Sequence, residues 1–107
     1  MTDISIERDS ERCIVEARGH AGADRNENGH DLVCASISML CTTFAQAIIE
    51  SQADDDTDIS SLRLEPGDVC IDFEIIRNSK RINAFIDMLE YGFELLENQY
   101  PQNVRVL

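Results

Sequence analysis

The feature that most constrains the fold is a change of hydrophobic period that occurs twice along the chain. Residues 3–7 and 12–18 alternate polar and apolar side chains, which is the pattern of two half-buried strands. Apolar residues then recur at helical spacing from Asp31 to about Gln52, with Asp31 placed to cap the first turn. The first half of the chain therefore predicts two strands and one amphipathic helix.

The second half repeats this order. Residues 62–65 and 69–74 alternate again, and the turn dipeptide Pro66-Gly67 separates them. Helical spacing follows from Asn78 or Ser79, a final short strand is predicted at 104–106, and the acidic run 53–58 is interpreted as a solvated linker. The doubled strand–strand–helix order predicts an α+β two-layer sandwich, in which a mostly antiparallel sheet of about five strands packs against two amphipathic helices.

Length and composition limit the class of protein. With 107 residues, of which 43% are hydrophobic, the chain is expected to form one domain over residues 1–107 with a real core. No uninterrupted apolar run approaches the roughly 18–20 residues of a membrane span, and the start of the chain lacks the pattern of a secretory signal. We therefore expect a cytoplasmic protein with no membrane partner.

The chain is strongly acidic, with a formal net charge of −12. This charge argues against nucleic acid as a partner, because binding to phosphates requires a basic face. It favours a basic protein partner through long-range attraction. Simple solubility is the alternative explanation for the same charge.

The four cysteines form no Cys-x-x-Cys pair. Cys34 and Cys41 lie two helical turns apart, about 10 Å along the axis, which is too far for a disulfide. Free thiols are expected. Cysteines in such elements are most often small buried hydrophobes, and we expect this of Cys13, Cys41 and Cys70.

Cys34 differs because a histidine and a helix start accompany it. Gly19 ends the second strand and places His20 at the rim of the sheet, while Cys34 lies in the first turn of the following helix. The positive end of the helix dipole favours a thiolate, and an imidazole can act as base, so the parts suit acyl transfer. Ser38, one turn after Cys34, shares its helix face.

A zinc site is the alternative reading of these side chains. His20, His30, Cys34 and an acidic residue supply suitable ligand atoms, but their spacing matches no standard zinc pattern. We therefore expect no metal and no organic cofactor.

Two motifs carry a resemblance to a known family. The sequences Gly19-His20-Ala21 and Gly29-x-Asp31-Leu32-Val33-Cys34-Ala35-x-Ile37-Ser38 closely resemble the ribosomal-processing cysteine protease family, Prp. The Tyr100-Pro101 pair and the short strand after it echo the end of that family. The resemblance implies an α/β homodimer in which His20 is the general base, Cys34 is the nucleophile, and Asp31 and Ser38 have support roles.

The resemblance also implies a substrate and a gate. The family removes a short N-terminal extension from the large-subunit ribosomal protein numbered twenty-seven, a basic protein that would suit the acidic chain. Its flexible loop implies that residues 21–30 gate the substrate, so that Gly19, Ala21, Gly22 and Gly29 belong to the gate. An apolar pocket for the substrate is expected near Cys34. Its candidate lining residues are Leu32, Met39 and Phe44.

Two other functions stay open on the sequence. One is an acidic ribosome-associated factor that holds a basic partner without cutting it. The other is a different thiol acyl hydrolase that uses the same His20 and Cys34 pair.

Overall fold

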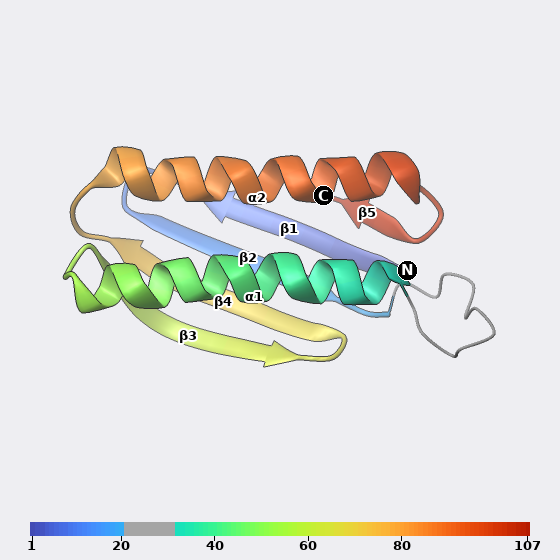
Figure 1. Ribbon diagram of the computed structural model, residues 1–107, viewed down its shortest axis with the longest axis horizontal. Helices are drawn as coiled ribbons and strands as arrows, with labels where there is room; N and C mark the ends of the chain where they lie inside the picture. Colours follow the sequence, from blue (N-terminus) through green and yellow to red (C-terminus); the bar gives the residue numbers. More distant parts are fainter. Residues whose placement is uncertain (21–31) are drawn as a thin grey trace.

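The computed structural model describes residues 1–20 and 32–107, and its elements follow the predicted β-β-α-β-β-α-β order (Figure 1). The first unit consists of β1 (Thr2–Arg8), β2 (Arg12–Arg18) and α1 (Leu32–Ala53). The second consists of β3 (Thr57–Glu65), β4 (Asp68–Ile75) and α2 (Ser79–Gln99), and β5 (Val104–Val106) follows. The predicted fold class is confirmed.

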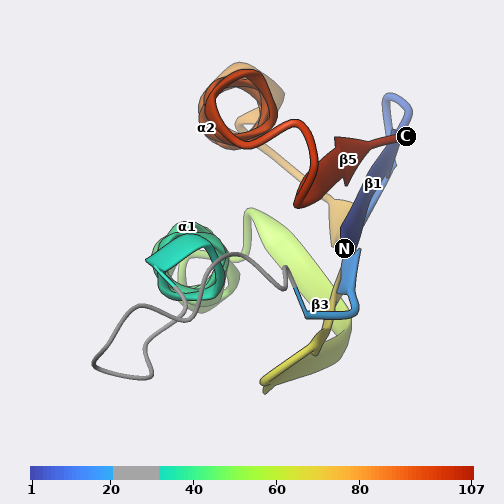
Figure 2. The same ribbon diagram turned by 90° about the vertical axis from the view of Figure 1, so that its right-hand side faces the viewer.

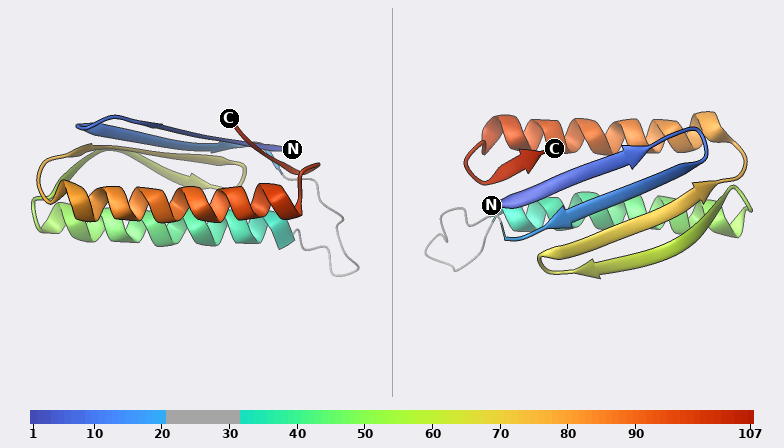
Figure 3. Two further views of the ribbon diagram at one scale, coloured as in Figure 1. Left: turned by 90° about the horizontal axis from the view of Figure 1, so that it is seen from above. Right: turned by 180° about the vertical axis from the view of Figure 1, so that it is seen from behind.

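One five-stranded sheet has the order β3-β4-β2-β1-β5. Its pairs are antiparallel except for β1 and β5, which run parallel. Seen end-on, both helices cover the same face of this sheet (Figure 2), and the view from behind shows the other face without a helix (Figure 3). The two β-hairpins meet through β2 and β4, in a pairing that joins segments some fifty residues apart in the chain, such as Arg18 and Asp68.

The core lies between the sheet and the helices. The alternating residues Cys13, Val15 and Ala17, which share one face of β2, are buried, and Phe73 of β4 packs against Phe44 of α1 with ring centroids 5.9 Å apart. Such interdigitation of apolar side chains is what fixes the helices on the sheet.

The β1–β2 turn and one cross-strand ion pair show how the exposed face of the sheet is held. Asp9 accepts hydrogen bonds from the backbone N–H groups of Glu11 and Arg12, and these bonds hold the pKa of Asp9 below its usual range. Across the sheet, Arg12 donates two hydrogen bonds to the carboxylate of Asp72, at 2.9 and 2.6 Å, and this contact lowers the pKa of Asp72.

The acidic run is only in part the solvated linker that the sequence predicted, since residues 54–55 are exposed but the two residues after them are buried. Strand β3 already begins at Thr57, and Asp56 is buried, with 2% of its surface exposed. The Asp56 carboxylate accepts a hydrogen bond from the Asn78 side chain and pairs with Arg77 at 3.5 Å. Asp56 therefore joins the end of α1 to the start of α2.

The prediction for Cys70 was also wrong. Cys13 and Cys41 are buried, whereas Cys70 is half-buried. It alternates along β4 with the buried residues Val69 and Ile71, so its side chain points to the sheet face that carries no helix.

Helix α1 is more apolar than a search for uninterrupted apolar runs indicates. Its mean hydropathy of 1.9 over 18 residues makes it, by length and composition, one helix able to cross a membrane. Core helices pass the same test, and α1 places a buried stripe that includes Val33, Ile37 and Ile48 on the sheet. Helix α1 is therefore packed on the sheet from its first turn, which also carries Cys34.

Candidate active site

Four segments meet at one end of the molecule and enclose a small pocket of about 60 Å³. They are the start of β1, the end of β2, the first turns of α1 and the β3–β4 turn, which lie together at the right of Figure 1. The pocket residues in the part of the chain that the structure describes are Thr2, Ala17, Gly19, His20, Cys34, Ile37, Ser38, Glu65, Pro66, Gly67 and Val69.

Hydrogen bonds from two sides fix the backbone of Gly19 and His20 beside this pocket. The Gly19 N–H donates to the Gly67 carbonyl at 2.9 Å, which extends the β2–β4 pairing by one step. On the other side, the Met1 nitrogen donates to the His20 carbonyl at 2.6 Å and the Thr2 hydroxyl donates to the Gly19 carbonyl at 3.2 Å. The backbone that carries the imidazole is thus fixed between β1 and the β3–β4 turn.

Gly67 lies directly against the His20 ring. It has a φ of +72°, and a Cβ atom built on it would come within 2.8 Å of both Cε1 and Nε2 of His20. Both facts require glycine here, because other residues rarely adopt this backbone conformation and have no room for the side chain. Gly67 therefore forms one wall of the imidazole site.

The thiol comes from the opposite wall. Cys34 is the third residue of α1 and is partly exposed, and Ser38 lies one turn further along the same helix face. The N-terminal turn of a helix carries a partial positive charge that stabilises an anion. The structure thus brings His20, Cys34 and Ser38 around one pocket, with the buried residues Ile37 and Val69 at its apolar floor.

Not every predicted site residue can be placed. Gly19 lines the pocket, but Ala21, Gly22, Gly29 and Asp31 lie outside the described residues, and so does His30.

The expected apolar lining was wrong in detail. Leu32, Met39 and Phe44 do not line this pocket among the described residues. Ile37, the buried residue one turn from Cys34, takes that place because it points into the core between helix and sheet.

Sequence reasoning missed the contribution of the β3–β4 turn. The sequence predicts a strand through Glu65 and a turn at Pro66-Gly67 and gives neither a functional meaning, yet all three residues line the pocket. The turn was visible in the Pro-Gly dipeptide, but its position beside His20 depends on the β2–β4 pairing, which no local pattern reports.

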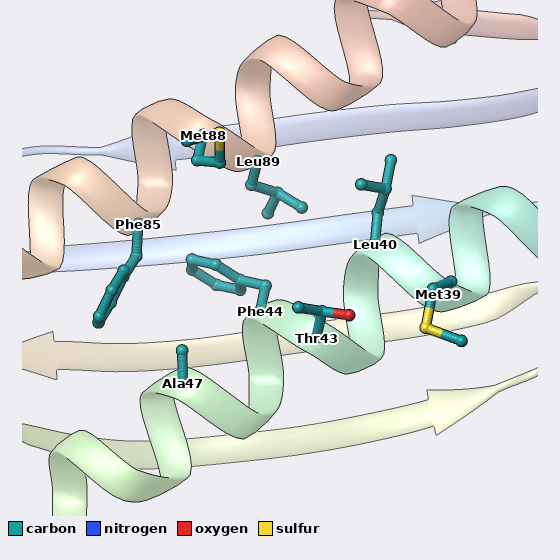
Figure 4. Close-up of a pocket in the computed structure, with 8 residues that line it drawn as sticks. All are labelled: Met39, Leu40, Thr43, Phe44, Ala47, Phe85, Met88 and Leu89. Atoms are coloured by element: carbon teal, nitrogen blue, oxygen red, sulfur yellow. The ribbon is translucent and has the colours of Figure 1, made fainter.

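A second hollow, of about 180 Å³, lies between the two helices and shares no residue with the first. Figure 4 shows that Leu40 and Phe44 of α1 and Leu89 of α2 point into the space between the helices. Met39 and Met88 at its rim are 66% and 70% exposed. The helix groove, defined by Met39, Leu40, Thr43, Phe44, Ala47, Phe85, Met88 and Leu89, is almost wholly apolar.

Comparison with known proteins identifies the family. The sequence model of the family described as Cysteine protease Prp matches residues 1–105. A crystal structure of the essential ribosomal processing protease Prp from S. aureus, with a covalently linked product peptide, superposes with a TM-score of 0.72 at 25% identity, covering 99% of this chain and 97% of that one. The same protease with a substrate peptide gives a TM-score of 0.69 at 21% identity, covering 100% and 98%.

None of the curated protein sequences compared with the chain matches it. The family match nevertheless spans nearly the whole sequence, and the structural match spans the whole fold. The chain belongs to the Prp family of cysteine proteases.

Proposed function

We propose that this protein is a cysteine endopeptidase that removes a short N-terminal extension from a basic large-subunit ribosomal protein during ribosome assembly. The observation that carries the proposal is that His20 and Cys34, fourteen residues apart in sequence, line the same pocket. The similar S. aureus protein is a ribosomal processing protease seen with substrate and product peptides, which supports the same class of substrate here.

The reaction begins at the thiol. His20 takes the proton from Cys34, and the Sγ thiolate attacks the carbonyl carbon of the scissile peptide bond. The carbon–nitrogen bond then breaks, the electron pair stays with nitrogen, and the protonated His20 gives its proton to the leaving amine. Water hydrolyses the resulting thioester, which releases the new carboxylate and restores the thiol.

The helix start and its neighbours support these steps. The partial positive charge at the N-terminus of α1 stabilises both the thiolate and the oxyanion of the tetrahedral intermediate. Asp31 and Ser38 are proposed to have supporting roles, Asp31 at the helix start or on His20, and Ser38 on the pocket wall, where its side chain is exposed.

Charge and location fit this substrate. A chain with a net charge of −12 attracts a basic protein over long range and raises the rate of encounter at low salt. A cytoplasmic location is proposed because ribosome assembly takes place there, and cysteines that form no disulfide with one another in the described part of the chain suit a reducing compartment.

The test uses the host's large-subunit ribosomal protein with its N-terminal extension, whose sequence is taken from the genome of the same organism. Wild-type protein should shorten it to a defined product mass, whereas Cys34→Ala should bind it without cleavage. Cys70→Ala is the matched control, because it removes a half-buried thiol on the sheet face away from the pocket. An unchanged substrate mass with wild-type protein that still binds the substrate would favour the non-cleaving factor, and turnover of a small thioester alone would favour another acyl hydrolase.

We also propose that two copies associate through the helix groove. Residues 32–49 of α1 contain no Asp, Glu, Lys or Arg, although 28% of the whole chain is charged. Two chains of charge −12 repel each other, so an uncharged apolar face is where they can approach closely. Burial of Met39 and Met88 would remove the most exposed apolar side chains of the groove from water.

Solution mass tests this association. Met88→Glu should convert a dimer to a monomer in light scattering or sedimentation, because it places a charge in the groove. Ile76→Glu, at an exposed position in the β4–α2 connection, should leave the mass unchanged. A wild-type protein that is monomeric at high micromolar concentration would disprove the association.

A further inference from the structure

The outer edge of β3 is open where it approaches the active-site pocket. Strand β3 is the end strand of the sheet, and its last residue, Glu65, lines the same pocket as Cys34. The edge strand is drawn at the margin of the sheet in Figure 1 and from behind in Figure 3. Exposed strand edges are templates for pairing with another chain, and proteins usually protect them.

Only the distant half of this edge is protected in the part of the chain that the structure describes. The Gln52 side chain of α1 accepts a hydrogen bond from the Ile59 N–H at 2.6 Å, and the register shift between Ile59 and Ser61 bends the strand there. The half nearer the pocket has a charged residue, Arg63, but its guanidinium is paired with Asp68 at 2.8 Å. Residues 60–65 therefore keep an edge that a further strand can join.

Two leucines give this open edge an apolar side. Leu62 and Leu64 lie opposite Ile71 and Val69 of β4, and directly opposite residues in antiparallel strands point to the same face. Ile71 and Val69 are buried beneath the helices, whereas Leu62 and Leu64 remain 39% and 40% exposed. Apolar surface is thus left at the helix-covered face of the edge, leading toward the pocket.

We propose that the outer edge of β3 from Ser60 to Glu65 docks an extended stretch of the substrate peptide as an added β-strand, with substrate side chains against Leu62 and Leu64. This inference rests on the proposed endopeptidase function and adds how the substrate is held. The occupant is an extended peptide from a basic protein, because the edge is continuous with the pocket of Cys34 and the chain is strongly acidic. Added-strand docking obtains affinity from main-chain hydrogen bonds and specificity from alternate side chains.

Strand geometry sets the length of peptide that this site requires. Leu62 is three residues from Glu65, which corresponds to about 10 Å along the strand. A substrate must therefore extend at least about four residues from the scissile bond on one side to reach Leu62. Shortening that side below four residues should raise KM about tenfold, whereas equal shortening of the other side should have a smaller effect.

The binding experiment uses Cys34→Ala protein and a synthetic peptide that spans the extension and the following eight or so residues of the host ribosomal protein. On binding, backbone amides of residues 60–65 should shift in NMR spectra, and the alternate amides that face the open edge should exchange more slowly with solvent. Binding with changes at the pocket but none at residues 60–65 would overturn the docking mode and leave the proposed function standing. Absence of both binding here and cleavage by the wild-type protein would overturn the proposed function itself.

A kinetic experiment gives an independent answer with wild-type protein. N-methylation of successive peptide nitrogens should raise KM at every second position on the docked side, because alternate N–H groups face the strand edge. Uniform tolerance of N-methylation over four consecutive positions would disprove strand pairing.

A variant pair completes the test. The double substitution Leu62→Ser and Leu64→Ser should raise KM about tenfold with kcat within about twofold, since it removes binding that is common to substrate and transition state. Ile76→Ser is the matched control, an exposed apolar residue at the far end of the molecule, and should leave both constants unchanged. An unchanged KM in a folded double variant would show that the two leucines do not contact the substrate.

Discussion

Replacing Gly67 by alanine should impair catalysis more than it impairs folding. The new Cβ atom would lie 2.8 Å from Cε1 and Nε2 of His20, so the ring must retreat by about 0.6 Å to restore an ordinary 3.4 Å contact. A misplacement of about 1 Å in a reacting group can reduce the rate about a hundredfold. We therefore expect kcat/KM to fall about 30- to 100-fold, equivalent to about 2–3 kcal/mol of transition-state stabilisation.

The stability cost of the same substitution has a separate origin. The φ of +72° at position 67 lies in the left-handed region, which costs an alanine about 1–2 kcal/mol. For a chain of this length the melting temperature should fall by roughly 4–10 °C. The variant should therefore remain folded at 25 °C, where its activity can be measured.

Peptide cleavage followed by mass spectrometry, together with thermal unfolding, checks both numbers. Gly67→Asn is the informative companion, because asparagine tolerates a positive φ but still carries a Cβ atom. It should lose as much activity as Gly67→Ala and less stability. Gly92→Ala is the control for crowding alone, since its Cβ would meet the flexible Leu40 side chain, away from the pocket.

One result would refute this reasoning. If folded Gly67→Ala protein keeps its kcat/KM within threefold of wild type, then contact with Gly67 does not position the His20 ring. A loss confined to KM would equally contradict the prediction, because displacement of a general base acts on the chemical step.

Three further predictions concern thiols, acid and the helix junction. Burial raises the pKa of Cys13 and of Cys41 to about 12, so only about one in ten thousand of these thiols is ionised at pH 8. Alkylation of the native protein should therefore label Cys34 first, and should label Cys13 and Cys41 only after unfolding. The hydrogen bonds from Arg12 lower the pKa of Asp72 in the folded state. The ionised Asp72 therefore stabilises the fold at pH values above its unfolded-state pKa of about 4, and this stabilisation is lost as the pH falls through the folded-state pKa. Asp72→Asn should make the free energy of unfolding less dependent on pH in the acid range. Asp56→Ala should reduce the free energy of unfolding by about 1–3 kcal/mol in urea titrations, because it removes the hydrogen bond that the buried Asp56 carboxylate accepts from Asn78 and its ion pair with Arg77.

The strands and helices themselves were predictable because their signals are local. The alternation of Cys13, Val15 and Ala17 reports a half-buried strand whatever the rest of the chain does, and these residues are buried. The start of β3 was not predictable in this way. The acidic neighbours of Thr57 are hydrophilic and predict a solvated linker, but Asp56 is buried and its carboxylate contacts Asn78, twenty-two residues later.

The inward face of α1 was only partly predictable, for a different reason. Helical spacing of the apolar residues places Leu40 in the stripe expected to be buried, but Leu40 is half-buried at the helix groove, whereas Cys41, next to it, is fully buried. A helix that is apolar on most of its surface has a weak hydrophobic periodicity, so the sequence does not show which of two neighbouring apolar residues faces the core. The second helix has polar residues on its outer face. Of its six apolar residues at helical spacing, Ile82, Ile86, Leu89 and Phe93 are buried, whereas Phe85 and Leu96 are half-buried.

The sequence predicted the two reactive residues of the candidate site, but it did not predict all of the residues that line the pocket around them. The motifs around His20 and Cys34 indicated the chemistry, and the structure places both at one pocket. The wall formed by Gly67 depends on which strands are neighbours in the sheet. The strand order is a property of the whole fold, and local sequence patterns do not predict which strands are neighbours.

The contact between His20 and Gly67 also limits when the proposed site can form during synthesis of the chain. The two residues are 47 positions apart, so the imidazole has no wall until the β3–β4 turn has left the ribosome. At about 5–20 residues per second, translation needs roughly 2–10 s to cover that interval. With His20 and Cys34 in their proposed roles, a nascent chain that already displays both side chains is expected to stay inactive until its second hairpin has joined the first.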